Sequence, residues 1–164
     1  VACRTSSTPL PTPGMAAPAE SAASAIKPTV EGTINVLDKV RDAAQRGSNA
    51  AAEGYSRKNP DLWWRAQAAI SGATQNLAHA YAAVDALLPT TEANVKVLTN
   101  LLEGVADLAV ANVDVGIGWA QGKRTQEPMS VSYTMAWRVE SKIAGVIDAV
   151  DAAKVALRNL EPTT

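Results

Sequence analysis

Apolar residues recur between Pro60 and Pro89 with the spacing of one face of an α-helix. The apolar positions follow at alternating steps of three and four residues: Trp63, Ala66, Ile70, Ala73, Leu77, Ala80, Val84 and Leu87. This unbroken heptad pattern favours near-parallel packing against other helices in a bundle. Asn59, Pro60 and Asp61 match an N-cap, a first helical residue and a first-turn acid. The pattern therefore predicts a helix from Pro60 to the residue before Pro89.

Two more segments have one apolar and one charged face, which is the pattern of an amphipathic helix. The first begins after Pro28 and Thr29, with Gly47 and Gly54 weakening its second half. Its apolar residues are Val30, Ile34, Leu37 and Ala44, and its charged residues are Asp38, Lys39, Arg41 and Asp42. The second runs from about Glu140 to Leu160, with Ile143, Ile147, Val150 and Leu157 opposite Asp148, Asp151, Lys154 and Arg158.

The segment that follows Pro89 carries two apolar stripes. Thr90 or Thr91 is the expected cap, and Glu92 lies in the first turn. One stripe contains Val95, Leu98, Leu102, Val105 and Ala109, and the other contains Val97, Leu101 and Leu108. Such a wide apolar surface indicates burial on more than one side of the helix. The very short turn at Pro89 predicts that this helix and the preceding one are antiparallel neighbours.

Residues 112–139 fit two structures. Apolar residues alternate with polar or small ones over 113–119 and again over 131–139, which is typical of β-strands. The two strands would form a hairpin around residues 122–128, although an isolated two-stranded hairpin is marginal in water. In the other interpretation, the third helix continues to about Gln121 and the last helix starts at Pro128.

We expect the all-helical arrangement, an all-α fold with an up-down bundle of four helices over residues 29–161. An α+β fold with a hairpin at about 112–139 is the alternative. The first 28 residues contain five prolines and many Ser, Thr and Ala residues. Such a sequence buries too little apolar surface to fold by itself, so we expect a flexible, disordered N-terminal tether.

The only cysteine, Cys3, stands at the start of this tether. The tripeptide Val1-Ala2-Cys3 resembles the end of the lipobox of bacterial lipoproteins, where a signal peptide is cut just before the Cys. The resemblance implies a diacylglycerol on the Cys3 thiol and export to the periplasm or the cell surface. The lipid would anchor the protein to a bacterial membrane such as the outer membrane. A free thiol in a frayed terminus is the alternative.

Composition narrows the possible partners. The 164 residues include 15 basic and 16 acidic side chains, so a nucleic acid is not an expected partner. No uncharged apolar run is long enough to predict a transmembrane helix. Alanine accounts for 32 residues and phenylalanine for none. Small side chains contribute little burial energy each, so we expect stability to come from long helices, a ligand or a partner.

The candidate chemical groups are few. His79 is the only histidine, and no acidic residue precedes it by three positions, so we expect no metal site. A haem held by His79 and either Met129 or Met135 is conceivable, but the sequence has no c-type attachment motif. Asp107 and Asp114 share a helix face without a nucleophile or base beside them. We therefore expect neither an enzyme nor a cofactor.

Two glycines near Trp119 form the sequence Gly116-Ile117-Gly118, which is too short for a phosphate-binding loop. We expect these glycines to allow close helix packing or to mark a bend.

Four aromatic residues are the candidate partner-binding side chains. Neighbouring helical residues point about 100° apart. If Trp63 is buried with the other apolar residues of the heptad pattern, Trp64 therefore lies outside that apolar face. An exposed Trp is typical of a binding surface, and packing against the first helix or the tether is the alternative for Trp64. We add Trp119, Tyr133 and Trp137, the last two being one helical turn apart.

These features predict a non-enzymatic structural or interaction protein. Its expected role is that of an exported lipoprotein subunit in a larger periplasmic or cell-surface assembly, bound to a protein partner or to itself. One alternative is a carrier that binds an apolar ligand or haem inside the bundle. Another is a virion or filament subunit whose helices bury a second apolar face against a neighbour.

Overall fold

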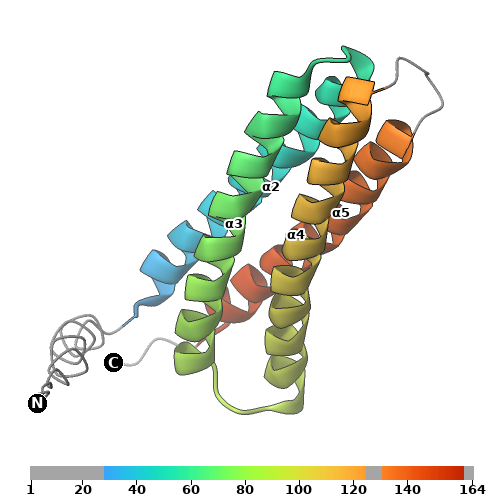
Figure 1. Ribbon diagram of the computed structural model, residues 1–164. Helices are drawn as coiled ribbons and strands as arrows, with labels where there is room; N and C mark the ends of the chain where they lie inside the picture. Colours follow the sequence, from blue (N-terminus) through green and yellow to red (C-terminus); the bar gives the residue numbers. More distant parts are fainter. Residues whose placement is uncertain (1–27, 125–130, 161–164) are drawn as a thin grey trace, which may run out of the picture.

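The computed structural model describes residues 28–124 and 131–160, and within these ranges it contains helices and no strands. In chain order the helices are α2 (Val30–Ser56), α3 (Pro60–Leu87), α4 (Glu92–Arg124) and α5 (Val131–Arg158). They lie side by side, and consecutive helices run in opposite directions (Figure 1). The all-α bundle expected from the sequence is confirmed.

The four helices form a ring in which each packs against two neighbours. α2 and α4 each contact both α3 and α5, so α2 and α4 occupy opposite corners. We call the end that holds the α2–α3 turn the upper end, because it is uppermost in Figure 1. The upper end also contains the end of α4 and the start of α5, whereas the α3–α4 turn lies at the lower end.

Side-chain caps explain where three helices start. Thr29 Oγ1 accepts a hydrogen bond from the Gly32 amide at 3.0 Å, and Asn59 Oδ1 accepts one from the Asp61 amide at 3.0 Å. At the start of α4, Thr91 Oγ1 accepts from the Asn94 amide at 3.1 Å. Each bond satisfies an amide that has no partner within its helix. The sequence predicted all three starts, and it left open whether Thr90 or Thr91 is the cap.

The core at the upper end is built around Trp63, which is 2% exposed. A Cβ added at Gly54 of α2 would come within 2.8 Å of Trp63 Cδ1, and one at Gly118 of α4 within 2.5 Å of Cζ3. The indole is therefore held between α2 and α4, and both glycines are needed for that close approach. By contrast, a Cβ at Gly116 would meet no atom within 4 Å.

The hairpin alternative for residues 112–139 is wrong, because its described parts belong to α4 and α5. The alternation has a different physical origin, since both helices carry apolar side chains on two opposite faces. Val115 and Met135 are buried in the core. Val113 and Trp137 lie two residues from them and are 62% and 60% exposed. A second apolar face on a helix can therefore imitate the period of a strand.

Candidate functional site

Trp64 and Trp119 meet between α3 and α4 near the upper end. Their ring centroids are 5.6 Å apart, and the ring planes are inclined by 67°, which is an edge-to-face arrangement. Trp64 is nevertheless 55% exposed, whereas its neighbour Trp63 is buried. The predicted separation of the two tryptophans is confirmed. The ring contact of Trp64 is with α4, not with the first helix as in the alternative.

Tyr55 and Tyr133 form a second pair between α2 and α5. Their centroids are 5.4 Å apart and their planes are inclined by 60°. Tyr133 remains about half exposed, and Trp137, one turn further along α5, is 60% exposed. The sequence did not indicate Tyr55, because its partner Tyr133 lies on a helix that is distant in the sequence.

The four predicted aromatic residues therefore do not form one cluster. The structure brings Trp64 and Trp119 together between α3 and α4, and it places Tyr133 and Trp137 on the side where α5 meets α2. We call the Trp64–Trp119 and Tyr55–Tyr133 contacts the aromatic pairs. Both aromatic pairs lie at the upper end. The Tyr55–Tyr133 pair joins α2 and α5, which are not consecutive. The Trp64–Trp119 pair joins α3 and α4, whose connecting turn lies at the lower end.

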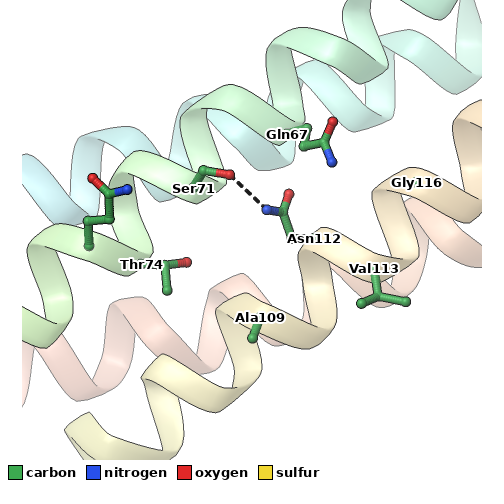
Figure 2. A pocket seen from close by; sticks show the side chains of 8 residues that line it. Gln67, Ser71, Thr74, Ala109, Asn112, Val113 and Gly116 are labelled. Carbon is green, nitrogen blue, oxygen red and sulfur yellow. Dashed lines mark hydrogen bonds between the residues drawn. The ribbon is translucent and has the colours of Figure 1, made fainter. Parts of the chain in front are cut away.

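A groove of about 550 Å³ runs between α3 and α4 beside the tryptophan pair. Figure 2 shows polar side chains of α3 facing small residues of α4 across it. The lining residues are Gln67, Ser71, Thr74, Gln75, Ala109, Asn112, Val113 and Gly116. Its side chains from α3 are amides and hydroxyls, whereas α4 contributes Ala109, Val113 and Gly116 beside Asn112.

Asn112 is the most unusual polar residue of this groove. Its Nδ2 donates to Ser71 Oγ at 2.9 Å, which links α4 to α3 (Figure 2). Its Oδ1 is buried and has no hydrogen-bond partner among the described residues. A buried acceptor without a donor costs about 1–3 kcal/mol. A water molecule or a ligand donor in the groove would remove that cost. The sequence did not indicate this role for Asn112.

The outward side of α4 holds five of the nine large hydrophobic side chains that are exposed among the described residues. Its large side chains are between about two-fifths and three-fifths exposed: Val95, Leu102, Val110, Val113 and Ile117. The sequence indicated that this helix would be buried on more than one side. In the single chain, α3 and α5 cover only its inner side, and the outward stripe faces solvent.

The carboxylates considered for catalysis are paired with cations of α5. Asp114 Oδ2 lies 3.2 Å from Arg138 Nε, and Asp107 Oδ1 lies 3.8 Å from Lys142 Nζ. These ion pairs tie α4 to α5, which gives both aspartates a structural role. The described residues contain no group of three His, Cys, Asp or Glu side chains that could hold a metal ion.

Other sequence candidates are far apart or lie outside the described residues. His79 is exposed towards the lower end of α3, whereas Met135 is buried near the start of α5 at the upper end. These two side chains therefore cannot hold one haem iron between them. Cys3 and Met129 lie outside the described residues. In the part of the chain that the structure describes, no helix has the length and apolar character needed to cross a bilayer.

Comparisons with known proteins add no relative. No protein-family model matches the chain, and neither the curated proteins nor the solved structures contain a significant match.

Proposed function

We propose that the protein is a non-enzymatic interaction subunit of a larger exported assembly, held at a bacterial membrane by a lipid on Cys3. The observation that carries this proposal is the exposure of aromatic side chains at the upper end. Trp64, Tyr133 and Trp137 are each about half exposed or more. Large aromatic residues in such positions are enriched where proteins bind other proteins.

The aromatic pairs also make the upper end a preorganised binding surface. Trp64 is held by its ring contact with Trp119, and Tyr133 by its contact with Tyr55. An aromatic side chain that is already fixed loses little conformational entropy when it binds. The buried carboxylate nearest to this end, Asp114, is paired with Arg138 and so has a structural role.

A crosslinking experiment in the source cells tests the docking surface. A photo-reactive amino acid is placed at Trp64 in one variant and at Arg46, an exposed residue on α2, in a matched control. We expect the Trp64 position to give a discrete crosslinked protein and the Arg46 position to give none. Equal products from both positions, or no product from Trp64, would contradict docking at the upper end.

A second test separates binding from folding. We expect Trp64→Ala to abolish that complex while leaving the thermal unfolding midpoint nearly unchanged, since Trp64 is 55% exposed. The matched variant Trp63→Ala is expected to lower the midpoint strongly, because Trp63 is buried in the core. An equal loss of stability in both variants would make Trp64 a core residue instead.

The lipid anchor is tested independently of the docking surface. Mass spectrometry of the native protein should find a diacylglycerol adduct on the peptide that contains Cys3, and Cys3→Ser should release the protein from the membrane fraction. An unmodified thiol in the native protein would refute the anchor and leave the docking surface untouched.

The two other functional classes make different predictions. A haem carrier requires a Soret absorption band in the purified protein, and the distance between His79 and Met135 weighs against that pair as ligands. A filament subunit requires an interface that repeats without closing. The outward side of α4 is the surface that would have to form such a repeating interface.

A further inference from the structure

The outward side of α4 carries a complete heptad seam of its own. Its members follow at steps of 4, 3, 4, 3, 4, 3 and 4 residues: Val95, Thr99, Leu102, Ala106, Ala109, Val113, Gly116 and Ala120. We call these eight residues the outer seam. The first six are exposed, and the last two are half-buried. None of the eight is charged, and at 1.5 Å per residue the seam is about 38 Å long.

The outer seam has the same form as the buried seam of the same helix. Leu101, Gly104, Leu108, Ala111, Val115 and Gly118 also alternate at steps of three and four, and all of them are buried against α3, α5 and α2. We call these six the inner seam. Since this spacing is what packs one helix along another, the outer seam has the geometry to receive a further helix.

We propose that the outer seam packs against the outer seam of a second copy of this chain, with the two α4 helices antiparallel. The two-fold axis of this dimer passes between Ala106 and Ala109. The proposal goes beyond the docking surface at the upper end, because it uses α4 and needs none of the aromatic pairs.

The outer seam is self-complementary when its direction is reversed. The reversal pairs Ala106 with Ala109, Leu102 with Val113, Thr99 with Gly116, and Val95 with Ala120 of the second copy. Small residues meet at the centre, where they allow the helix axes to approach to about 8 Å. Outside the centre, a larger side chain meets a smaller one in every pair. A two-fold interface requires a patch that fits itself in this way.

The charges beside the outer seam are compatible with the antiparallel arrangement. Lys96 and Glu103 lie seven residues apart on the flank that faces α5, and both are exposed. With the two-fold axis between Ala106 and Ala109, they come to the level of Trp119 and Asn112 of the second copy. The nearest residues on the matching flank of that copy are Ile117 and Val110, so no like charges meet.

The two-fold interface closes on itself. Because each outer seam is fully used by one other copy, the assembly stops at two chains and does not extend into a filament through α4. The upper end of each copy remains accessible for a different partner, and the two upper ends point in opposite directions.

Analytical ultracentrifugation of the full chain tests the dimer, with Cys3→Ser as the background to remove the native thiol. We expect a monomer–dimer equilibrium in the micromolar range. Leu102→Glu and Val113→Glu should each weaken it by at least about tenfold, because two carboxylates would be buried in every dimer. The matched control is Val155→Glu on α5, which starts from the same exposed fraction as Leu102, 54%, and should leave the equilibrium unchanged.

Cysteine crosslinking tests the direction of the helices. Thr99→Cys and Gly116→Cys are prepared separately in the same background, and the second is tolerated because a Cβ at Gly116 meets no atom within 4 Å. Oxidation of the mixture should yield a covalent dimer of one Thr99→Cys chain and one Gly116→Cys chain. Thr99→Cys alone should stay uncrosslinked, because its two thiols would lie about 25 Å apart along the dimer.

Each outcome bears on the proposal. A monomer throughout the micromolar range, a dimer that Leu102→Glu leaves intact, or crosslinking of Thr99→Cys with itself would overturn it. A complex of α4 with an unlike protein in place of the dimer would overturn it as well. The crosslink at Trp64 in the source cells is a separate measurement. The proposed function can therefore hold when no dimer forms, and the dimer can form when Trp64 gives no crosslink.

Discussion

The inner and outer seams of α4 have the same spacing and opposite environments. Leu101 and Leu102 are neighbours in the sequence, yet Leu101 is fully buried and Leu102 is 54% exposed. Leu101 points towards α3 and α5, whereas no described helix covers Leu102. The comparison teaches that periodicity shows which face of a helix is able to pack, but it does not show what covers that face.

The outward side of α2 makes the contrast sharper. α2 stands at the opposite corner of the ring, and its outward residues are exposed and mostly charged or polar: Glu31, Asn35, Lys39, Asp42, Gln45, Arg46 and Asn49. Two helices in equivalent positions of one bundle thus present opposite chemistry to the solvent. A polar outward face is what a helix needs when nothing covers it, so the apolar face of α4 requires a separate explanation.

The largest difference between the two seams is expected for truncation of the neighbouring leucines. Leu101→Ala should lower the free energy of unfolding by about 2–5 kcal/mol, since it leaves a cavity in the core. Leu102→Ala should change it by less than about 0.5 kcal/mol in the monomer, because the side chain is already half in water. Urea unfolding at concentrations below dimer formation measures both values. Similar losses for the two variants would mean that the seams do not differ as described.

The glycines of the two seams should respond in opposite directions to the same change. Gly118→Ala is expected to cost about 1–3 kcal/mol, because its Cβ would lie 2.5 Å from Trp63 Cζ3 and the indole cannot move without disturbing the core. Gly116→Ala should stabilise the monomer by about 0.5–1 kcal/mol, since the site is open and Ala favours helix. Thermal unfolding of the two variants provides the test. A stabilising Gly118→Ala would show that Trp63 is not held between α2 and α4.

The two ion pairs between α4 and α5 provide a smaller contrast within one side of the bundle. The Asp114 side chain is 4% exposed and that of Asp107 is 40% exposed. Asp114→Asn should cost about 1–3 kcal/mol, because a buried charge-assisted hydrogen bond to Arg138 is weakened. Asp107→Asn should cost less than about 1 kcal/mol, as is usual for a solvated pair. Chemical unfolding at low and high salt measures both, and a larger salt effect for Asp114 than for Asp107 would count against this ranking.

The sequence predicted the elements of this fold well because their signals are local. The heptad pattern of α3, the helix start after Thr29, the cap Asn59 and the break at Pro89 each depend on a few neighbouring residues. Each appears in the structure where it was expected. The start of α5 was predicted poorly. Tyr133, Met135 and Trp137 alternate with smaller or polar residues, and only the neighbouring helices reveal that Met135 is buried while the two aromatic residues are not.

The candidate site could be predicted only in part. The sequence indicated Trp64, Trp119, Tyr133 and Trp137 as exposed aromatic residues, but it could not pair them with one another or with Tyr55. The sequence also could not predict the roles of Gly54 and Asn112. Gly54 is needed only because Trp63 of another helix packs against it. The Oδ1 atom of Asn112 lacks a hydrogen-bond partner only because of the residues that surround it in the folded bundle.

The amino-acid sequence by itself determined that the part of this chain that the structure describes forms four antiparallel helices, because periodicity, caps and short turns are properties of neighbouring residues. Only the tertiary structure decided which apolar face of each helix enters the core. α4 carries two seams of equal spacing, and a single ring of four helices can cover one of them. The physical reason is that burial depends on the number of neighbours a face meets, and that number is set by the whole bundle.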